Sequence, residues 1–324
     1  MTIAERVAPE GSELPVLITP AFNGETLPEA FLRLQADIEG LVETVGGVLL
    51  RGFLVPEISD FKDFASSFGN PLLTYEFGST PRSAVSKGVY TSTSYPAHQH
   101  IPLHNEQAYT REWARKIWFH SVLSAQSGGE TPIADSRAIY QNMPLSIRNK
   151  FKKGLLYVRN YGDFDLPWQQ VFNTENRAEV EAYCRRTKIE CQWTEDDGLR
   201  TSQLCQGIEQ HYKTGEKVWF NQGHLFHISN LQAEVRESLE DLLDLDEMPR
   251  NVYFADGSVI SDDIFTEVRA VLAEQTVLFP WENGDVLMLD NMLVAHARTP
   301  FEGERQVVVA MADPHSNLDR EHFG

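Results

Sequence analysis

The sequence predicts a mainly β protein with flanking helices, built as a sandwich or jelly roll in a single domain over residues 1–324. Short segments rich in Val, Ile, Phe, Tyr, Trp and Thr occur in both halves of the chain, as strands do. They do not alternate with helices in the way that a doubly wound parallel sheet requires. Composition stays even along the chain, so we interpret about 162–280 as a helical insertion beside the β core.

Two helices and a buried strand are expected before the β-rich region. In residues 28–46 apolar side chains recur three or four positions apart, which is the spacing of one helix face. The apolar segment 46–53 follows a glycine break and predicts a short buried strand. Residues 59–69 predict a second helix, with Ser59 as its N-cap and Gly69 past its end.

The β-rich region begins near residue 85 and continues to the C-terminal part of the chain. Its strands are predicted from their β-branched and aromatic content at 88–95, 116–123, 155–162, 217–222, 285–291 and 305–312. Helices are predicted between these strands at about 177–187, 233–244 and 261–274.

The charge balance and the cysteines restrict the classes of partner and compartment. Acidic side chains number 47 and basic ones 28, which gives a formal charge of −19. This field would repel nucleic acid and anionic membranes, so neither is expected as a partner. The chain has no apolar run of about 18 residues and no signal-like start. Its three cysteines show no tight pair, which favours a reducing, cytoplasmic location.

The segment "PLHNEQAYT" sets His104 and Glu106 two residues apart, as a polar turn or as two arms of a metal site. A metal site needs a third ligand from another strand, and His296 follows the apolar segment that ends at Asp290. Two histidines and a carboxylate on a β scaffold form the facial arrangement of non-haem Fe(II) oxygenases, which leaves coordination positions open. A buried histidine with a structural role remains the alternative for His296.

Two further residues fit a dicarboxylate that chelates iron at one end. Arg305 opens the strand after His296, and Thr131 lies in the segment "SGGETPIAD". Arginine offers a bidentate contact to a distal carboxylate, and threonine adds one hydroxyl donor. A zinc site formed by His98, His100 and His104 is a second interpretation, but no other cluster completes a closed tetrahedral set.

These motifs resemble the taurine dioxygenase-like Fe(II)/2-oxoglutarate dioxygenases, in the branch of clavaminate synthase and the SyrP-like amino-acid hydroxylases. The resemblance covers residues 80–313 and rests on His-x-Glu, then "GGETP", then a distal histidine with a following arginine. It implies a double-stranded β-helix (jelly roll) core, with Fe(II), 2-oxoglutarate and O2 as the reacting set. Carried over by residue, it makes His104, Glu106 and His296 the iron ligands, and Thr131, Arg305 and Arg298 the contacts of 2-oxoglutarate.

The resemblance also implies the type of reaction. Related halogenases have a small residue at the position of Glu106, so this chain is expected to oxygenate its substrate. Hydroxylation comes first, with desaturation, epoxidation or cyclisation as alternatives. Arg305 is followed by Gln306, where many relatives carry a second basic residue.

The substrate class is the least specific part of the prediction. We expect an amino acid or small peptide, free or tethered to a carrier protein, in natural-product biosynthesis. Ser92, Ser94 and Asn221 are the candidate substrate contacts, and the basic segment 148–153 is a candidate carrier surface. The alternatives are a non-catalytic protein and a cupin-like metal protein that does not use 2-oxoglutarate.

Overall fold

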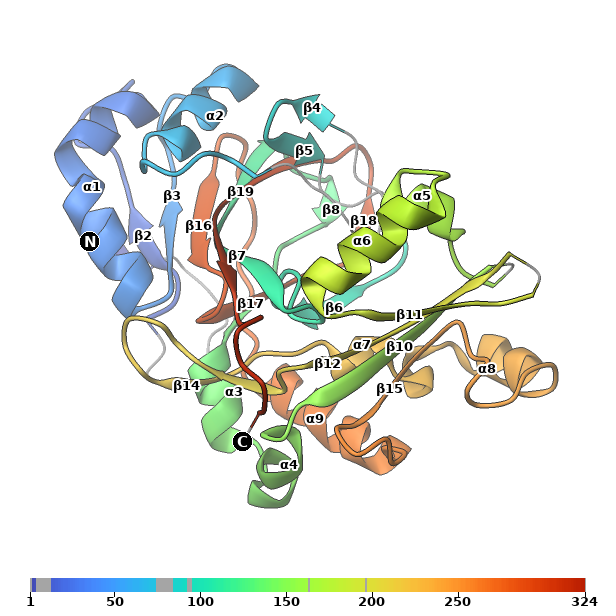
Figure 1. The fold of residues 1–324 in the computed structure, drawn as a ribbon. Coiled ribbons are helices and arrows are strands. Elements are labelled where there is room, and N and C mark those ends of the chain that lie inside the picture. The colour runs from blue at the N-terminus through green and yellow to red at the C-terminus, as the bar shows by residue number, and fades with distance from the viewer. Residues whose placement is uncertain are drawn as a thin grey trace.

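Two β-sheets form the centre of the computed structural model, which describes residues 2–3, 13–73, 84–91, 95–162, 164–195 and 197–323 (Figure 1). In this described part the larger sheet has the order β1 (Thr2–Ile3), β2 (Val16–Ile18), β3 (Gly47–Leu50), β16 (Val286–Asp290), β7 (Glu112–Leu123), β19 (Gln306–Ser316), β5 (Val89–Thr91) and β4 (Ala84–Ser86). The smaller sheet has the order β6 (Ile101–His104), β17 (Val294–Arg298) and β9 (Ile133–Asp135).

The main hydrophobic core lies between these two sheets. Ile117, Leu287 and Val309 from the larger sheet pack in one buried cluster with Ile133 and Val294 from the smaller sheet. Burial of about 25 cal/mol per Å2 of apolar surface makes such a cluster the main source of stability. The sheets therefore face each other, and any polar group between them lies in a dry environment.

Two N-terminal helices cover the outer face of the larger sheet (Figure 1). The helix predicted at 28–46 is α1 (Leu27–Thr44), which Thr26 caps through a capping box with Glu29. The second is α2 (Ile58–Ser66), and here the predicted cap was wrong. Glu57 is the N-cap, because the Asp60 carboxylate accepts the Glu57 N–H at 3.0 Å and sets the first turn before Ser59.

The segment of the chain between β9 and β16 contains helices and a four-stranded sheet of its own. It begins with α3 (Ser136–Asn142) and α4 (Leu145–Phe151). Its four-stranded sheet has the order β11 (Glu190–Trp193), β12 (Leu199–Cys205), β10 (Leu155–Tyr161) and β15 (Arg250–Phe254). The prediction of a helical insertion was therefore incomplete, since β12 alternates buried and half-buried residues as a one-sided strand does.

The helices predicted within this segment are confirmed, with one shorter than expected. They are α6 (Arg177–Thr187), α8 (Ala233–Glu240) and α9 (Asp262–Glu274), and a short α5 (Trp168–Phe172) precedes them. The strand predicted at 217–222 ends early, as β14 (Lys217–Trp219), because the chain turns into α7 (Gly223–Phe226). β13 (Ile208–Gln210) pairs with β14, and the 3-10 turn η1 (Ile228–Asn230) follows α7.

Two predictions about extent are only partly addressed. The strand predicted at 88–95 appears as β5, and residues 92–94 lie outside the described part of the chain. The single-domain organisation stays a prediction.

Among the described helices, none has the length and apolarity that crossing a bilayer needs.

Candidate metal centre

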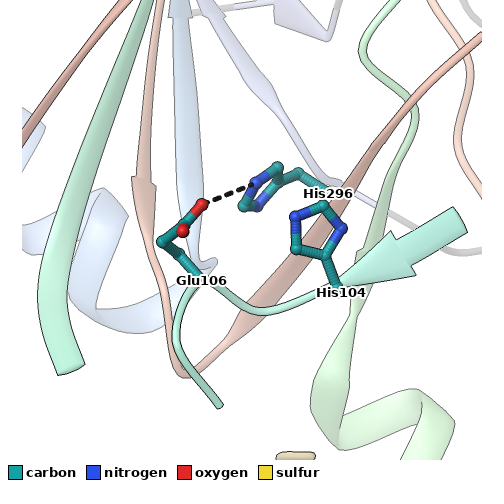
Figure 2. Close-up of side chains that lie close together, drawn as sticks. All are labelled: His104, Glu106 and His296. Atoms are coloured by element: carbon teal, nitrogen blue, oxygen red, sulfur yellow. Dashed lines mark ion pairs between the residues drawn. The ribbon is translucent and has the colours of Figure 1, made fainter. Parts of the chain in front are cut away.

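The predicted metal ligands come together where β6 pairs with β17. His296 lies opposite His104 in this antiparallel pair, and Glu106 follows two residues after His104, beyond the end of β6. Figure 2 shows the three side chains turned toward one another. Their ligand atoms all lie within 4.8 Å of one another, and among the described residues no other set of three His, Cys, Asp or Glu side chains is grouped for a shared metal.

The geometry of the cluster is compact and enclosed. The imidazole centroids of His104 and His296 are 4.4 Å apart, and His296 Nε2 lies 3.9 Å from Glu106 Oε2 (Figure 2). Glu106 and His296 are buried, with exposed fractions of 5% and 4%. The Phe119 ring, from β7 of the larger sheet, lies 4.9 Å from the His296 ring. The cluster therefore lies between the two sheets against an apolar wall.

The donor set fits a divalent iron ion. His104 Nδ1 lies 2.8 Å from the Pro102 carbonyl oxygen. A carbonyl can only accept, so Nδ1 carries the hydrogen and Nε2 presents its lone pair to the centre. Two imidazole nitrogens and one carboxylate are the ligands that non-haem Fe(II) oxygenases use, with the remaining positions open to other groups.

Arg305, the predicted contact of 2-oxoglutarate, lies beside the turn that leads to Thr131. Strand β8 (Ser127–Gly128) pairs with β18 (Phe301–Glu302), and Gly129 directly follows β8. Arg305 Nε donates to the Gly129 carbonyl at 2.8 Å. Burial, and then the charge of Arg298, lowers the pKa of the Arg305 guanidinium to about 10. Two neighbouring cations in a desolvated place favour the binding of an anion.

Thr131 is buried two residues beyond Gly129, with an exposed fraction of 2%. Its hydroxyl oxygen accepts a hydrogen bond from Trp281 Nε1 at 3.1 Å. This contact orients the oxygen, so the hydroxyl hydrogen is directed to another acceptor. Trp281 is a supporting residue that sequence reasoning missed, and its only signal was a tryptophan shortly before the β16 segment.

Arg298 is held by a neighbouring loop. Its Nη1 donates to the Tyr95 carbonyl at 2.9 Å, and its Nη2 donates to the carbonyls of Pro96 at 2.6 Å and Gln99 at 2.9 Å. The guanidinium thus fixes residues 95–99 beside the site and adds positive charge near Arg305. Its predicted direct contact with 2-oxoglutarate stays a prediction.

The candidate substrate contacts receive little structural support. Ser92 and Ser94 lie outside the described residues. Asn221 is buried, and its amide is engaged at both ends, with Nδ2 donating to the Gly207 carbonyl at 2.7 Å and Oδ1 accepting the Gly223 N–H at 3.0 Å. These contacts give Asn221 a structural role at the start of α7, so we do not include it among the proposed substrate contacts.

The other histidines of the sequence analysis lie outside the ligand group. His98 and His100 are not part of the cluster of three, so the described residues do not support the zinc interpretation. His224 Nε2 donates to the Leu103 carbonyl at 2.8 Å, beside the strand that carries His104. Burial lowers the pKa of the His224 imidazole to about 3, so the ring is neutral and packs against β6.

Comparison with known families decides the class of protein. Residues 13–311 match the family described as "Taurine catabolism dioxygenase TauD, TfdA family". The chain belongs to this dioxygenase family. It is 41% identical over 300 residues to the dapdiamide synthesis protein DdaC of Enterobacter agglomerans, covering 92% of this chain and 91% of the relative. It is also 31% identical over 317 residues to a clavaminate synthase-like protein of Arabidopsis thaliana, covering 94% and 92%.

Solved structures agree on the fold. PvcB of Pseudomonas aeruginosa superimposes with a TM-score of 0.55 at 14% identity, covering 95% of this TauD-like dioxygenase and 89% of PvcB. Family membership confirms the predicted class, a non-haem iron enzyme that uses 2-oxoglutarate.

The packing of Gly129 on Arg305 leads to a first prediction. A Cβ at Gly129 would lie 2.9 Å from Arg305 Cδ and 3.0 Å from Nε, and the backbone φ is +75°. We expect Gly129→Ala to displace the guanidinium and raise the apparent KM for 2-oxoglutarate on the order of tenfold, as loss of about 1.4 kcal/mol of a charge-assisted contact does. Steady-state kinetics at saturating Fe(II) measure this change.

Gly257→Ala is the matched control for Gly129→Ala. Its φ of +81° carries the same left-handed strain, and no atom lies within 4 Å of the added Cβ. Both variants should lose about 1–2 kcal/mol of stability from that strain. An equal rise of KM in both would show that the contact with Arg305 is not the cause.

Proposed function

We propose that this dioxygenase oxygenates an unactivated C–H bond of an amino acid or small peptide, with Fe(II) held by His104, Glu106 and His296. The observation that carries the proposal is the convergence of the three ligand atoms within 4.8 Å, between two facing sheets. We further propose that these sheets are the two halves of a double-stranded β-helix. In this arrangement His104 and His296 lie on the paired strands β6 and β17, Glu106 follows β6, and Thr131 and Arg305 precede β9 and β19.

Each residue of the site has a distinct task in this proposal. When bound, iron, 2-oxoglutarate and O2 together supply the oxidative decarboxylation that gives succinate and CO2, with one oxygen atom of O2 entering succinate and the other available to oxidise the substrate. Arg305 and Thr131 bind the distal carboxylate of 2-oxoglutarate and so orient it for chelation. His104, Glu106 and His296 would hold the ion, and Phe119 and the surrounding core would limit the access of water to it.

Glu106 sets the type of product that we propose. Its carboxylate lies 3.9 Å from His296 Nε2 and would occupy a coordination position next to that ring. A halide would need that position, so transfer of oxygen is favoured over transfer of halogen. Hydroxylation is the first expectation, and desaturation, epoxidation or cyclisation are the other outcomes of the same oxidation.

The relatives support the substrate class that we propose. DdaC is named for dapdiamide synthesis, and the identity of 41% over most of both chains makes a role in natural-product biosynthesis our proposal for this chain too. A carrier-tethered substrate would have to dock against a net charge of −19. Arg148 and Lys150 on α4 form part of the basic segment 148–153 that could receive an acidic carrier.

The proposed location is the cytoplasm. The three cysteines, Cys184, Cys191 and Cys205, form no disulfide, which agrees with a reducing compartment.

The proposed function is tested by anaerobic titration with Fe(II) and 2-oxoglutarate, followed by a substrate screen. Binding should produce the metal-to-ligand charge-transfer absorption of a chelated 2-oxo acid. Amino acids, small peptides and aminoacyl carriers are then screened in air for substrate-dependent succinate. A protein that binds metal but forms no succinate with any substrate would instead support the cupin-like alternative.

The same screen, repeated in saturating chloride, tests the prediction that the product is oxygenated and not halogenated. We expect a gain of one oxygen or a loss of two hydrogens in the substrate, measured by mass spectrometry, because Glu106 occupies the position that a halide would take. A chlorine isotope pattern in the product would contradict this assignment of Glu106.

A further inference from the structure

The turn between β16 and β17 leads into the strand that carries His296 and also contacts Glu106. This turn contains Asn291, and β17 follows it with His296. The other part of the candidate metal centre, with His104 and Glu106, comes from the end of β6, far away in the sequence. A residue of this turn can therefore fix the position of one ligand relative to another.

The Asn291 side chain binds the backbone of Glu106 on both sides. Its Oδ1 accepts the Glu106 N–H at 2.7 Å, and its Nδ2 donates to the Glu106 carbonyl at 2.9 Å. The same Nδ2 also donates to the Ala114 carbonyl of β7 at 2.8 Å. Asn291 is fully buried. The amide thus acts as a neighbouring strand would and satisfies both polar groups of the Glu106 backbone.

The turn that carries Asn291 is itself fixed. The Asn291 N–H donates to the Arg115 carbonyl at 2.7 Å. Asp290 Oδ1 accepts two backbone N–H groups of the turn at 2.8 and 3.0 Å, and Asp290 Oδ2 lies 3.0 Å from His211 Nε2. Asp290 and His211 are both buried, so water does not compete for these bonds. The Asn291 amide is therefore held on a rigid element.

The chain around Glu106 has left the regular geometry of the strand. Glu106 lies two residues beyond the end of β6, and the Asn291 amide bonds both polar groups of its backbone there. The next residue, Gln107, has a left-handed φ of 59°, which a residue with a Cβ adopts only where its surroundings impose it. The Glu106 side chain is buried, so its rotamers are restricted and a backbone shift would carry the carboxylate away from the metal.

We propose that Asn291 is a positioning residue that sets the Glu106 carboxylate relative to His296 and thereby the metal affinity of the centre. The inference rests on the proposed function in one respect, that Glu106 and His296 share a metal ion. The Asn291 amide bonds backbone groups of Glu106 and Ala114, so it acts on the ligand through the Glu106 backbone. Residues that support metal ligands in this way typically change metal affinity by about 10- to 100-fold.

The test is metal binding, measured without turnover. Anaerobic titration with Co(II), followed by its visible absorption, should show a dissociation constant raised on the order of 10- to 100-fold in Asn291→Ala. Asn291→Asp keeps an oxygen toward the Glu106 N–H but turns an acceptor toward two carbonyls, so it should weaken binding as well. The affinity for 2-oxoglutarate at saturating metal should stay within about twofold, because Arg305 is untouched.

Asn160→Ala is the matched control. The Asn160 amide donates to the carbonyls of Asp246 at 3.0 Å and Met248 at 2.8 Å and accepts from Arg200 Nη1 at 3.4 Å, in the sheet of β10 away from the ligands. It makes the same number of bonds as Asn291, so its loss reports the general cost of removing such an amide. Thermal unfolding of the metal-free proteins shows which variants are folded.

The outcomes separate this inference from the proposed function. Wild-type Co(II) affinity in folded Asn291→Ala or Asn291→Asp would overturn the positioning role and leave the metal centre standing. A loss of stability equal to that of Asn160→Ala, with unchanged metal affinity, would show a structural role only. Failure of the wild-type protein itself to bind Co(II) would contradict the proposed metal centre.

Discussion

Replacing His104, Glu106 or His296 by alanine is expected to abolish iron-dependent succinate formation while the protein stays folded. Each of the three supplies one donor atom to the same ion, so its loss should weaken Fe(II) binding by more than about 100-fold, the upper range for changes that only support a ligand. None of the three belongs to a hydrophobic cluster, so the thermal midpoint of the metal-free protein should change little. Iron content after anaerobic loading and succinate release measure the effect.

Two other histidines provide the comparison for these variants. His322 is exposed near the C-terminal end, and His322→Ala should load iron and turn over as the wild-type protein does. His98→Ala separates the iron and zinc interpretations, because His98 lies outside the ligand group. Full iron content and activity in His296→Ala would refute the assignment of the third ligand.

Replacing Arg305 by alanine is expected to raise the apparent KM for 2-oxoglutarate by tens-fold or more and to leave iron affinity nearly unchanged. The lost interaction is a charge-assisted, potentially bidentate contact in a desolvated place, which costs about 2–5 kcal/mol when one partner is removed. In the absence of the anion, Arg305 is a partly buried cation whose pKa is already lowered to about 10 by burial and by the charge of Arg298. Binding of 2-oxoglutarate should therefore raise the thermal midpoint of the wild-type protein more than that of Arg305→Ala.

Variants of Thr131 and Arg298 test how much each side chain contributes, beside Arg305, to binding the distal carboxylate of 2-oxoglutarate. Thr131→Val removes one neutral donor and should raise the KM less than Arg305→Ala does. Arg298→Ala should act mainly through residues 95–99, whose carbonyls its guanidinium binds. If 2-oxoglutarate titrates normally in Arg305→Ala, another cation binds its distal carboxylate, and Arg298 is the first candidate.

The elements that the sequence predicted best are those with a strong local pattern. Helix α1 has apolar residues on one face and a capping box at Thr26 and Glu29, and both signals lie within the segment itself. Strands β7, β16 and β19 are rich in buried apolar side chains and were predicted for the same reason. The short strands around His104 and His296, β6 and β17, were expected without bounds and β9 was missed, because each forms only by pairing with distant segments.

The predicted insertion shows the limit of local patterns. Its helices α6 and α9 appear within one residue of their expected bounds, yet its strands β12 and β15 pair on either side of β10, which precedes it. Composition could not reveal this pairing, because a half-buried strand resembles a polar connection when its partner strand is unknown.

The sequence by itself predicted the candidate ligands His104, Glu106 and His296, and Thr131 and Arg305 as candidate contacts of 2-oxoglutarate, because the chemistry of iron and of a dicarboxylate restricts the residue types that can serve. Only the tertiary structure decided that Arg298 binds a loop and that Asn291 supports Glu106 from 185 residues away. Hydrogen bonds between such distant residues leave no periodicity in the chain. They arise when the sheets pack and every buried polar group must find a partner.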